Sequence, residues 1–248
     1  MNFIGIFTGV GCILTSMVIE GTHPGIMINL PAFLVVCGAS FSGCVVEYPF
    51  SSILGAFKCF IWTIAPPRFN IGAQIEFLVS MGTTARQQGL LALENSIAAA
   101  NDDFTRGGIQ MIVDGVDKDT LHNILERAIE MEDAKLGPCS KFWLSLGGYS
   151  PTMGIIGAVL GLIHAMSLLD RPDLLGPSIA VAFVATIYGL ILANLIAIPS
   201  GNRIKTALFQ SMVYKTMTME GLVSIASGEN SMMLKRRLTA YTGQLSEE

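Results

Sequence analysis

The chain has 248 residues, of which 51% are hydrophobic and only 14% are charged, and its mean hydropathy is +0.56. About a quarter of the residues in a soluble globular protein are charged, so this composition excludes an ordinary soluble domain, and the low charge excludes a disordered chain as well. The net charge of −4 gives no indication of nucleic-acid binding.

Four long runs contain no Asp, Glu, Lys or Arg: residues 1–19, 21–46, 142–169 and 174–202. A transmembrane helix needs roughly 20 mostly apolar residues. The runs therefore predict an all-α integral membrane protein with four transmembrane helices in two hairpins. The expected spans are Phe3–Ile19, Ile28–Val46, Leu146–Leu168 and Ile179–Ile198. The first run lacks the basic start of a signal peptide, so we expect an uncleaved hairpin.

These runs divide the chain into a transmembrane hairpin at 1–46, a loop at 47–144, a second hairpin at 145–201 and a tail at 202–248. Fourteen of the fifteen Lys and Arg residues lie in the loop or the tail, and Arg171 is the exception. Because Lys and Arg accumulate on the cytoplasmic side of membrane proteins, we expect the loop, the tail and both termini to be cytoplasmic.

The loop is expected to be helical and to present two charges. Apolar residues recur at helical spacing over 75–97, which predicts one helix carrying Arg86 and Glu94 broadly on one side, about 12 Å apart. These charges are interpreted either as a solvated face or as a pair that meets opposite charges on a cytoplasmic partner.

Two more cytoplasmic helices are predicted. One covers Lys118–Lys135 and follows an N-cap at Asp117 or Asp119, and the other carries the tail to about Ile225.

The expected spans contain almost no ionisable side chains. Glu20 lies at an external end, and His164 is the one ionisable group within the third and fourth spans. Since intramembrane carboxylates usually mark an ion path, an ion handled by this chain needs a carboxylate from another chain.

Small residues follow helical spacing in the last two spans: Pro151, Gly154, Ala158, Gly161 and Ala165 in the third, and Ala182, Thr186, Gly189 and Ala193 in the fourth. Small residues allow helices to approach closely in lipid. The pattern fits packing of the third span on the fourth, a cage around a partner helix, or both. The Thr186 hydroxyl is expected to bond its own i−4 carbonyl, a partner's carboxylate or water.

Two prolines lie at the cytoplasmic ends of these spans. Pro151 is interpreted as a first-turn proline, a static kink or a hinge, and Pro199 as the end of the fourth span.

Four segments taken together carry a resemblance: Ile28-Asn29-Leu30-Pro31-Ala32-Phe33, Arg86 with Gly89-Leu90-Leu91-Ala92-Leu93-Glu94, Pro151-Thr152-Met153-Gly154, and Ala185-Thr186-Ile187-Tyr188-Gly189. The chain resembles the MotA/PomA family of flagellar stator subunits over its whole length. The resemblance implies a pentamer in the bacterial inner membrane around two copies of a MotB-like subunit. That partner is a single-span, peptidoglycan-binding protein whose intramembrane aspartate carries the ion, and the pentamer pushes the rotor protein FliG.

The resemblance also implies residue roles. Arg86 and Glu94 would contact the rotor, and Pro151 and Pro199 would couple ion flow to torque. The implied ion pathway runs beside Thr152, Ala158, Ala185 and Thr186.

The ion implied is a proton, with sodium as the alternative. Sodium-type members have extra hydroxyls in the last two spans, and this chain has Ala158 and Ala185 at the matching positions. Tyr188, which is common in sodium-type members, leaves sodium open.

Other functions fit less well. An ExbB- or TolQ-like energiser of outer-membrane processes would have three spans and an external N-terminus, and the uncharged hairpin at 1–46 argues against it. A self-sufficient ion channel would need an intramembrane charge or a broken-helix site. We expect no enzyme, metal site or cofactor, because the sequence has no catalytic triple, no phosphate loop and no suitably spaced cysteines.

Overall fold

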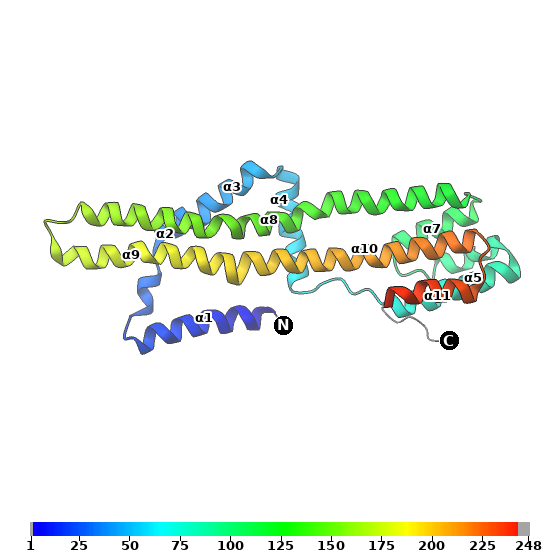
Figure 1. Ribbon diagram of the computed structural model, residues 1–248, viewed down its shortest axis with the longest axis horizontal. Coiled ribbons are helices and arrows are strands. Elements are labelled where there is room, and N and C mark those ends of the chain that lie inside the picture. Colours follow the sequence, from blue (N-terminus) through cyan, green and yellow to red (C-terminus); the bar gives the residue numbers. More distant parts are fainter. Residues whose placement is uncertain (1, 243–248) are drawn as a thin grey trace. The chain divides into compact units, whose positions relative to one another are not determined.

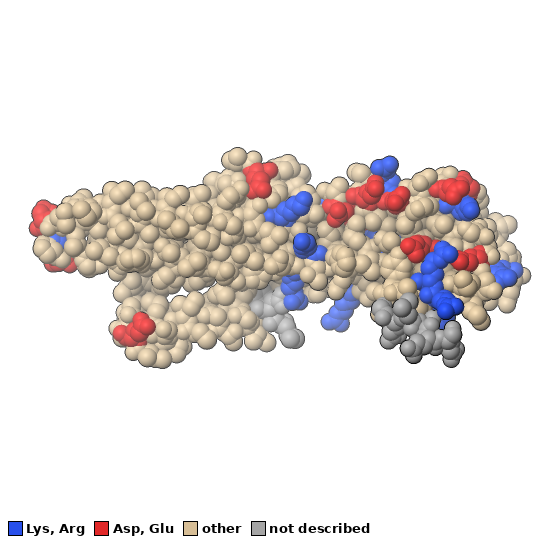
Figure 2. All heavy atoms as spheres, in the orientation of Figure 1, with Lys and Arg blue, Asp and Glu red and all other residues tan. Residues whose placement is uncertain are grey.

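The computed structural model describes residues 2–242, and these residues form helices and connecting loops without a strand (Figure 1). They divide into two compact units. Within the described residues, the apolar unit comprises residues 2–66 and 135–206, and the charged unit comprises residues 67–134 and 207–242. Figure 2 shows that Lys, Arg, Asp and Glu side chains are sparse over α1, α8 and α9 of the apolar unit.

The apolar unit contains α1 (Asn2–Ile19), η1 (Pro24–Met27), α2 (Leu30–Phe33), η2 (Leu34–Gly38), α3 (Ala39–Glu47), α4 (Phe50–Cys59), η3 (Phe60–Thr63), α9 (Pro172–Ile191) and η5 (Leu192–Ala197). The charged unit contains α5 (Ile71–Gln88), η4 (Leu90–Leu93), α6 (Glu94–Ile97), α7 (Asp103–Val113), α11 (Ser231–Thr239) and η6 (Ala240–Thr242). Two long helices, α8 (Lys118–Met166) and α10 (Ile198–Ala226), contribute residues to both units.

Three of the described helices are long and apolar enough to cross a membrane. They are Leu30–Glu47, Lys118–Met166 and Pro172–Ala226, with mean hydropathies of 1.7, 1.5 and 2.3 in their most apolar windows. They cover most of the second and third expected spans and all of the fourth. The first expected span also lies in a helix, α1 (Asn2–Ile19). The arrangement of four spans in two hairpins stays a prediction.

Helix α8 begins where the sequence predicted and ends much later. The Asp117 carboxylate caps it, because Oδ1 accepts the backbone N–H groups of Asp119 at 3.1 Å and Thr120 at 3.0 Å. The predicted end at Lys135 is wrong, since the helix continues to Met166. Beyond Lys135, buried Cys139, Phe142 and Leu146 keep the helical spacing and pack against α4 and α10, so no break in the apolar pattern separates the two parts.

Pro199 does not end a helix, so the prediction of a helix stop there is also wrong. Proline removes a helical N–H donor and crowds the carbonyl four residues earlier, here that of Leu195. Leu195 lies in η5, which has π-helical hydrogen bonding. Because this turn is wider than an α-helical turn, the chain passes Pro199 and continues as α10 to Ala226. The predicted end of this helix near Ile225 is confirmed.

Pro151 lies in the interior of α8, which excludes its interpretation as a first-turn proline.

The charged unit has its own apolar core. Helix α5 packs against α11, and both face α7 and the parts of α8 and α10 that belong to this unit. Fully buried core residues include Leu78, Ile109, Leu121, Leu222 and Leu234. This core supports the end of α5 and the start of α6, which carry the predicted rotor contacts Arg86 and Glu94.

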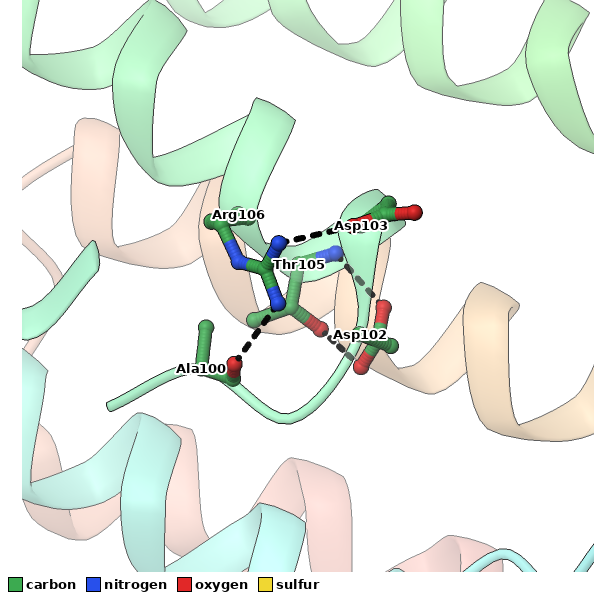
Figure 3. Close-up of polar contacts among 5 residues, drawn as sticks. All are labelled: Ala100, Asp102, Asp103, Thr105 and Arg106. Atoms are coloured by element: carbon green, nitrogen blue, oxygen red, sulfur yellow. Dashed lines mark hydrogen bonds and ion pairs between the residues drawn. The ribbon is translucent and has the colours of Figure 1, made fainter. Parts of the chain in front are cut away.

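Helix α7 is fixed by a polar cluster around Asp102 (Figure 3). The Asp102 carboxylate accepts the backbone N–H and the hydroxyl of Thr105, both at 2.7 Å, and also accepts the Tyr214 hydroxyl at 2.9 Å. Burial, followed by the Asp102 charge, raises the pKa of the Tyr214 phenol. Arg106 pairs with Asp103 at 2.8 Å and donates to the Ala100 carbonyl at 3.4 Å.

Removal of this cap should loosen the charged unit. For Asp102→Ala we expect the α7 amides to exchange hydrogen roughly 30-fold faster, since loss of an N-cap costs about 2 kcal/mol at the upper end of its range. Hydrogen–deuterium exchange on the purified protein measures this rate. Asp103→Ala is the matched control, because that carboxylate is 96% exposed and its ion pair contributes little. Equal exchange rates in both variants would contradict the assignment.

Candidate functional site

Helices α8 and α9 run side by side and touch backbone to backbone (Figure 1). A Cβ atom added at Gly154 would lie 3.0 Å from the carbonyl oxygen of Ala185, and one added at Gly189 would lie 2.5 Å from that of Ser150. At Gly161, an added Cβ would lie 2.6 Å from the Cβ of Ala182. The predicted packing of the two small-residue stripes on each other is therefore confirmed, and the cage around a partner helix stays a prediction.

The residues predicted for the ion pathway lie along this contact or close to it. Ala185 is buried within it, facing Gly154 and Gly157. Thr186 is half-buried, and its Cα would lie 3.2 Å from a Cβ added at Gly154. Ala158, next to Gly157, is also half-buried. Thr152 is exposed, and its hydroxyl donates to the Tyr149 carbonyl at 2.7 Å.

The Thr186 hydroxyl is not used within its own helix. Thr15 and Ser150 donate to carbonyls four residues earlier, at 2.7 and 2.5 Å. The alternative that Thr186 does the same is wrong, since its hydroxyl has no hydrogen bond to another described residue. A donor and an acceptor therefore remain available at the α8–α9 contact.

Tyr188 has a structural role. Its hydroxyl donates to the Met27 carbonyl and accepts the Asn29 N–H at 3.2 Å, which ties α9 to the start of α2. This oxygen is occupied by backbone groups, so Tyr188 adds little to the set of ion ligands.

The structure does not bring Pro151 and Pro199 together. The Pro151 Cα would lie 3.2 Å from a Cβ added at Gly189. Pro199 lies roughly 15 Å further along the same continuous helix than Gly189, at ~1.5 Å per residue. It is exposed and lines a groove between α1, η3 and α10. The two prolines therefore lie on separate parts of the helix pair, and their role in torque stays a prediction.

The sequence did not indicate a role for Glu47 at the end of α3. Its carboxylate accepts the hydroxyls of Tyr149 at 2.9 Å and Ser145 at 3.1 Å, both on α8. The Tyr48 hydroxyl also meets the Ser145 hydroxyl at 2.9 Å. The one feature of the sequence that could have indicated this role is that Glu47 directly follows the uncharged run at 21–46. Its contacts attach the second expected span to α8 just before Pro151.

Arg86 and Glu94 are both exposed, but they do not share a helix. Helix α5 ends at Gln88, and Gly89 has φ 86° and ψ 166°. Side chains other than that of glycine rarely adopt such a φ value, so the helix ends there. Arg86 lies before this turn, and Glu94 lies after η4, which carries the 73%-exposed Leu91. The prediction of one helix through both charges is wrong.

Comparison with known proteins agrees with this geometry. Residues 96–217 match the model of the MotA/TolQ/ExbB proton channel family. Motility protein A of Aquifex aeolicus is 33% identical over 254 residues, covering 100% of this chain and 98% of the relative. Motility protein A of Helicobacter pylori (strain ATCC 700392 / 26695) is 32% identical over 240 residues, covering 97% and 93%.

A solved structure has the same fold as this chain over its whole length. The structure of C. jejuni MotAB superimposes with a TM-score of 0.90 at 27% identity, covering 100% of this chain and 96% of that chain. With this fold, and with full-length relatives above 30% identity, the chain belongs to the MotA/TolQ/ExbB proton channel family, in its motility protein A group.

Proposed function

We propose that the chain is a subunit of the bacterial flagellar stator and couples ion flow across the inner membrane to torque. Agreement with motility protein A along the entire chain carries this proposal. The agreement includes residues 1–46, which an ExbB- or TolQ-like protein with three spans would not need. The role is transport and mechanical work, without catalytic chemistry.

The proposed topology has four spans in two hairpins and both termini in the cytoplasm. The three long apolar helices support it. A row of exposed side chains on α4 and η3 refines the boundary: Phe50, Leu54, Phe57, Ile61 and Ile64 are 49–71% exposed at helical spacing. An apolar face of this kind lies in the membrane interface. We therefore place residues 50–64 at the membrane surface, so the cytoplasmic part of the 47–144 loop begins beyond them.

The proposed partner is a single-span, peptidoglycan-binding subunit of the MotB kind, surrounded by a pentamer of this chain. The similarity to a MotAB structure supports such a partner. The sequence has no Asp or Glu in 142–169 or 174–202, so the partner must supply the ion-carrying acid. The available Thr186 hydroxyl can donate to that acid from the α8–α9 contact.

The proposed ion is the proton. A sodium ion needs several oxygen ligands, and in this pathway Ala158 and Ala185 supply no side-chain oxygen. The Tyr188 oxygen is occupied by backbone groups. One free hydroxyl and a partner carboxylate suffice for proton transfer along a hydrogen-bonded chain.

The proposed torque route uses both prolines and the exposed charges. Pro151 lies at the α8–α9 contact, so a movement of Thr186 would displace it. Pro199 follows later in the sequence, before the chain enters the charged unit. Arg86 and Glu94 would then meet opposite charges on FliG. One charge crossing 100 mV releases about 2.3 kcal/mol, whereas an exposed ion pair contributes only ~0–1 kcal/mol. Such contacts can therefore be broken at every step.

Swimming of a motile strain that lacks its own motility protein A tests the function and the ion together. The chain is expressed with its cognate partner, and speed is measured in sodium and in potassium medium. We expect swimming at the same speed in both media, and its loss with a protonophore. Absence of swimming in both media would contradict the stator function, and loss of speed in potassium alone would contradict the proton.

The role of Thr186 is tested by a matched pair of variants. Thr186→Val has nearly the same shape but no hydroxyl, so we expect a severalfold drop in swimming speed. Thr186→Ser keeps the hydroxyl and should retain most of the speed. Equal speeds for the two variants would exclude the hydroxyl from the ion pathway.

A further inference from the structure

A groove of about 560 Å³ lies in the apolar unit between α1, η3 and the start of α10. Its volume is within the range of small-molecule sites. Ile6, Phe60 and Leu195 contribute apolar lining, and Asn202, Arg203 and Thr206 contribute polar lining. No Asp or Glu is among the described residues that line it. The described part of the groove therefore combines an apolar wall with a cation.

The groove changes from apolar to polar along one helix face. Leu195, Pro199, Arg203 and Thr206 follow each other at helical spacing, over roughly 16 Å at ~1.5 Å per residue. Arg203 is the first charge after the uncharged run at 174–202. This order matches the order from acyl chain to headgroup in one leaflet of a bilayer.

A second observation indicates the same depth. The exposed apolar row on α4 continues through Ile61 in η3 and ends at Ile64. Phe60 and Ile64 also line the groove. Since such a row marks the membrane interface, the polar end of the groove is at headgroup level.

The surrounding charge favours an anion. The expected cytoplasmic end of the apolar unit has one acidic residue in the sequence, Glu47, and five basic residues: Lys58, Lys135, Lys141, Arg203 and Lys205. Lys and Arg side chains are visible where the uncharged surface over α8 and α9 ends (Figure 2). The cytoplasmic leaflet of a membrane is negatively charged, so lipid and protein are complementary at this level.

We propose that this groove binds one anionic phospholipid per chain, with the phosphate on Arg203 and an acyl chain along Ile6 and Leu195. The proposal rests on the membrane placement of the apolar unit given above. A guanidinium has five N–H donors, so it can bind a phosphate in addition to the contacts it makes within the protein.

The experiment uses the complex of this chain with its partner, reconstituted in bilayers of equal phosphatidylglycerol and phosphatidylcholine. After extraction in detergent, native mass spectrometry counts the retained lipids. Both lipids carry a phosphate, but the choline cation of phosphatidylcholine cancels its charge and repels Arg203, so we expect phosphatidylglycerol to be enriched roughly fivefold or more. Arg203→Gln should remove the enrichment. Lys205→Gln is the control, because it removes a nearby exposed cation that does not line the groove.

A second variant fills the groove without removing a charge. Gly5 lines the groove, and a Cβ added there meets no atom within 4 Å, so Gly5→Leu should fold and should displace both lipids. Equal retention of the two lipids by the unmodified chain would overturn the proposal. Undiminished enrichment in Arg203→Gln, or in Gly5→Leu, would also overturn it. So would cross-linking that shows a second copy of the chain in the groove. Each of these results leaves the swimming test unchanged, so the two proposals fail separately.

Discussion

The Gly189→Ala variant should lose swimming and should unfold at a lower temperature. The added Cβ would lie 2.5 Å from the Ser150 carbonyl oxygen and 3.2 Å from the Pro151 Cα. Both neighbours are backbone atoms, so α8 and α9 must move apart along a contact that includes Ala185 and Thr186. Overpacking costs about 1–3 kcal/mol, which corresponds to a drop in Tm of roughly 3–10 °C for a chain of this size.

Thermal unfolding in detergent and swimming speed are measured together for this variant. Gly148→Ala is the matched control, because Gly148 lies inside the partner helix α8 and its added Cβ meets no atom within 4 Å. It should unfold at the same temperature as the unmodified chain or slightly higher, since alanine favours helix over glycine. A Gly189→Ala variant with unchanged Tm and speed would contradict the close packing of the two helices.

Charge reversal at the rotor contacts should have the second large effect. Arg86→Glu and Glu94→Lys should each reduce torque severalfold while leaving the amount of folded protein unchanged, because both side chains are exposed. Tethered-cell rotation measures the torque. The control is Arg127→Glu, which reverses a 76%-exposed cation of the charged unit outside the turn around Gly89.

A compensating substitution in the rotor protein distinguishes loss of a direct contact from a general loss of motor function. Where Arg86 meets an acidic residue of the rotor, a basic substitution there should restore part of the torque of Arg86→Glu. Normal torque in Arg86→Glu, Glu94→Lys and the double variant would contradict the rotor-contact assignment.

Much of the fold could be predicted because it depends on interactions between residues close together in the sequence or on short sequence patterns. The start of α8 was predictable because an Asp before a helical apolar pattern caps the exposed N–H groups, as Asp117 does. The α8–α9 contact was predictable because helices in lipid approach through small residues, as Gly154 and Gly189 show.

The errors arose where tertiary structure decides between local alternatives. A glycine inside a helical pattern costs only ~1 kcal/mol, so spacing alone did not distinguish Gly89 as the end of α5. The π-helical turn of η5 that carries the chain past Pro199 leaves no periodic signal. The hydroxyls that bind Glu47 lie about a hundred residues further along the chain, and only the folded chain brings them together.

Proton flux into liposomes tests the central claim most directly, namely that this chain needs a partner's carboxylate to conduct. The chain alone, the complex with its single-span partner, and the complex with that partner's intramembrane aspartate replaced by asparagine are reconstituted at equal density. We predict flux for the intact complex and none for the other two preparations. Flux through the chain alone at the rate of the complex would contradict the account.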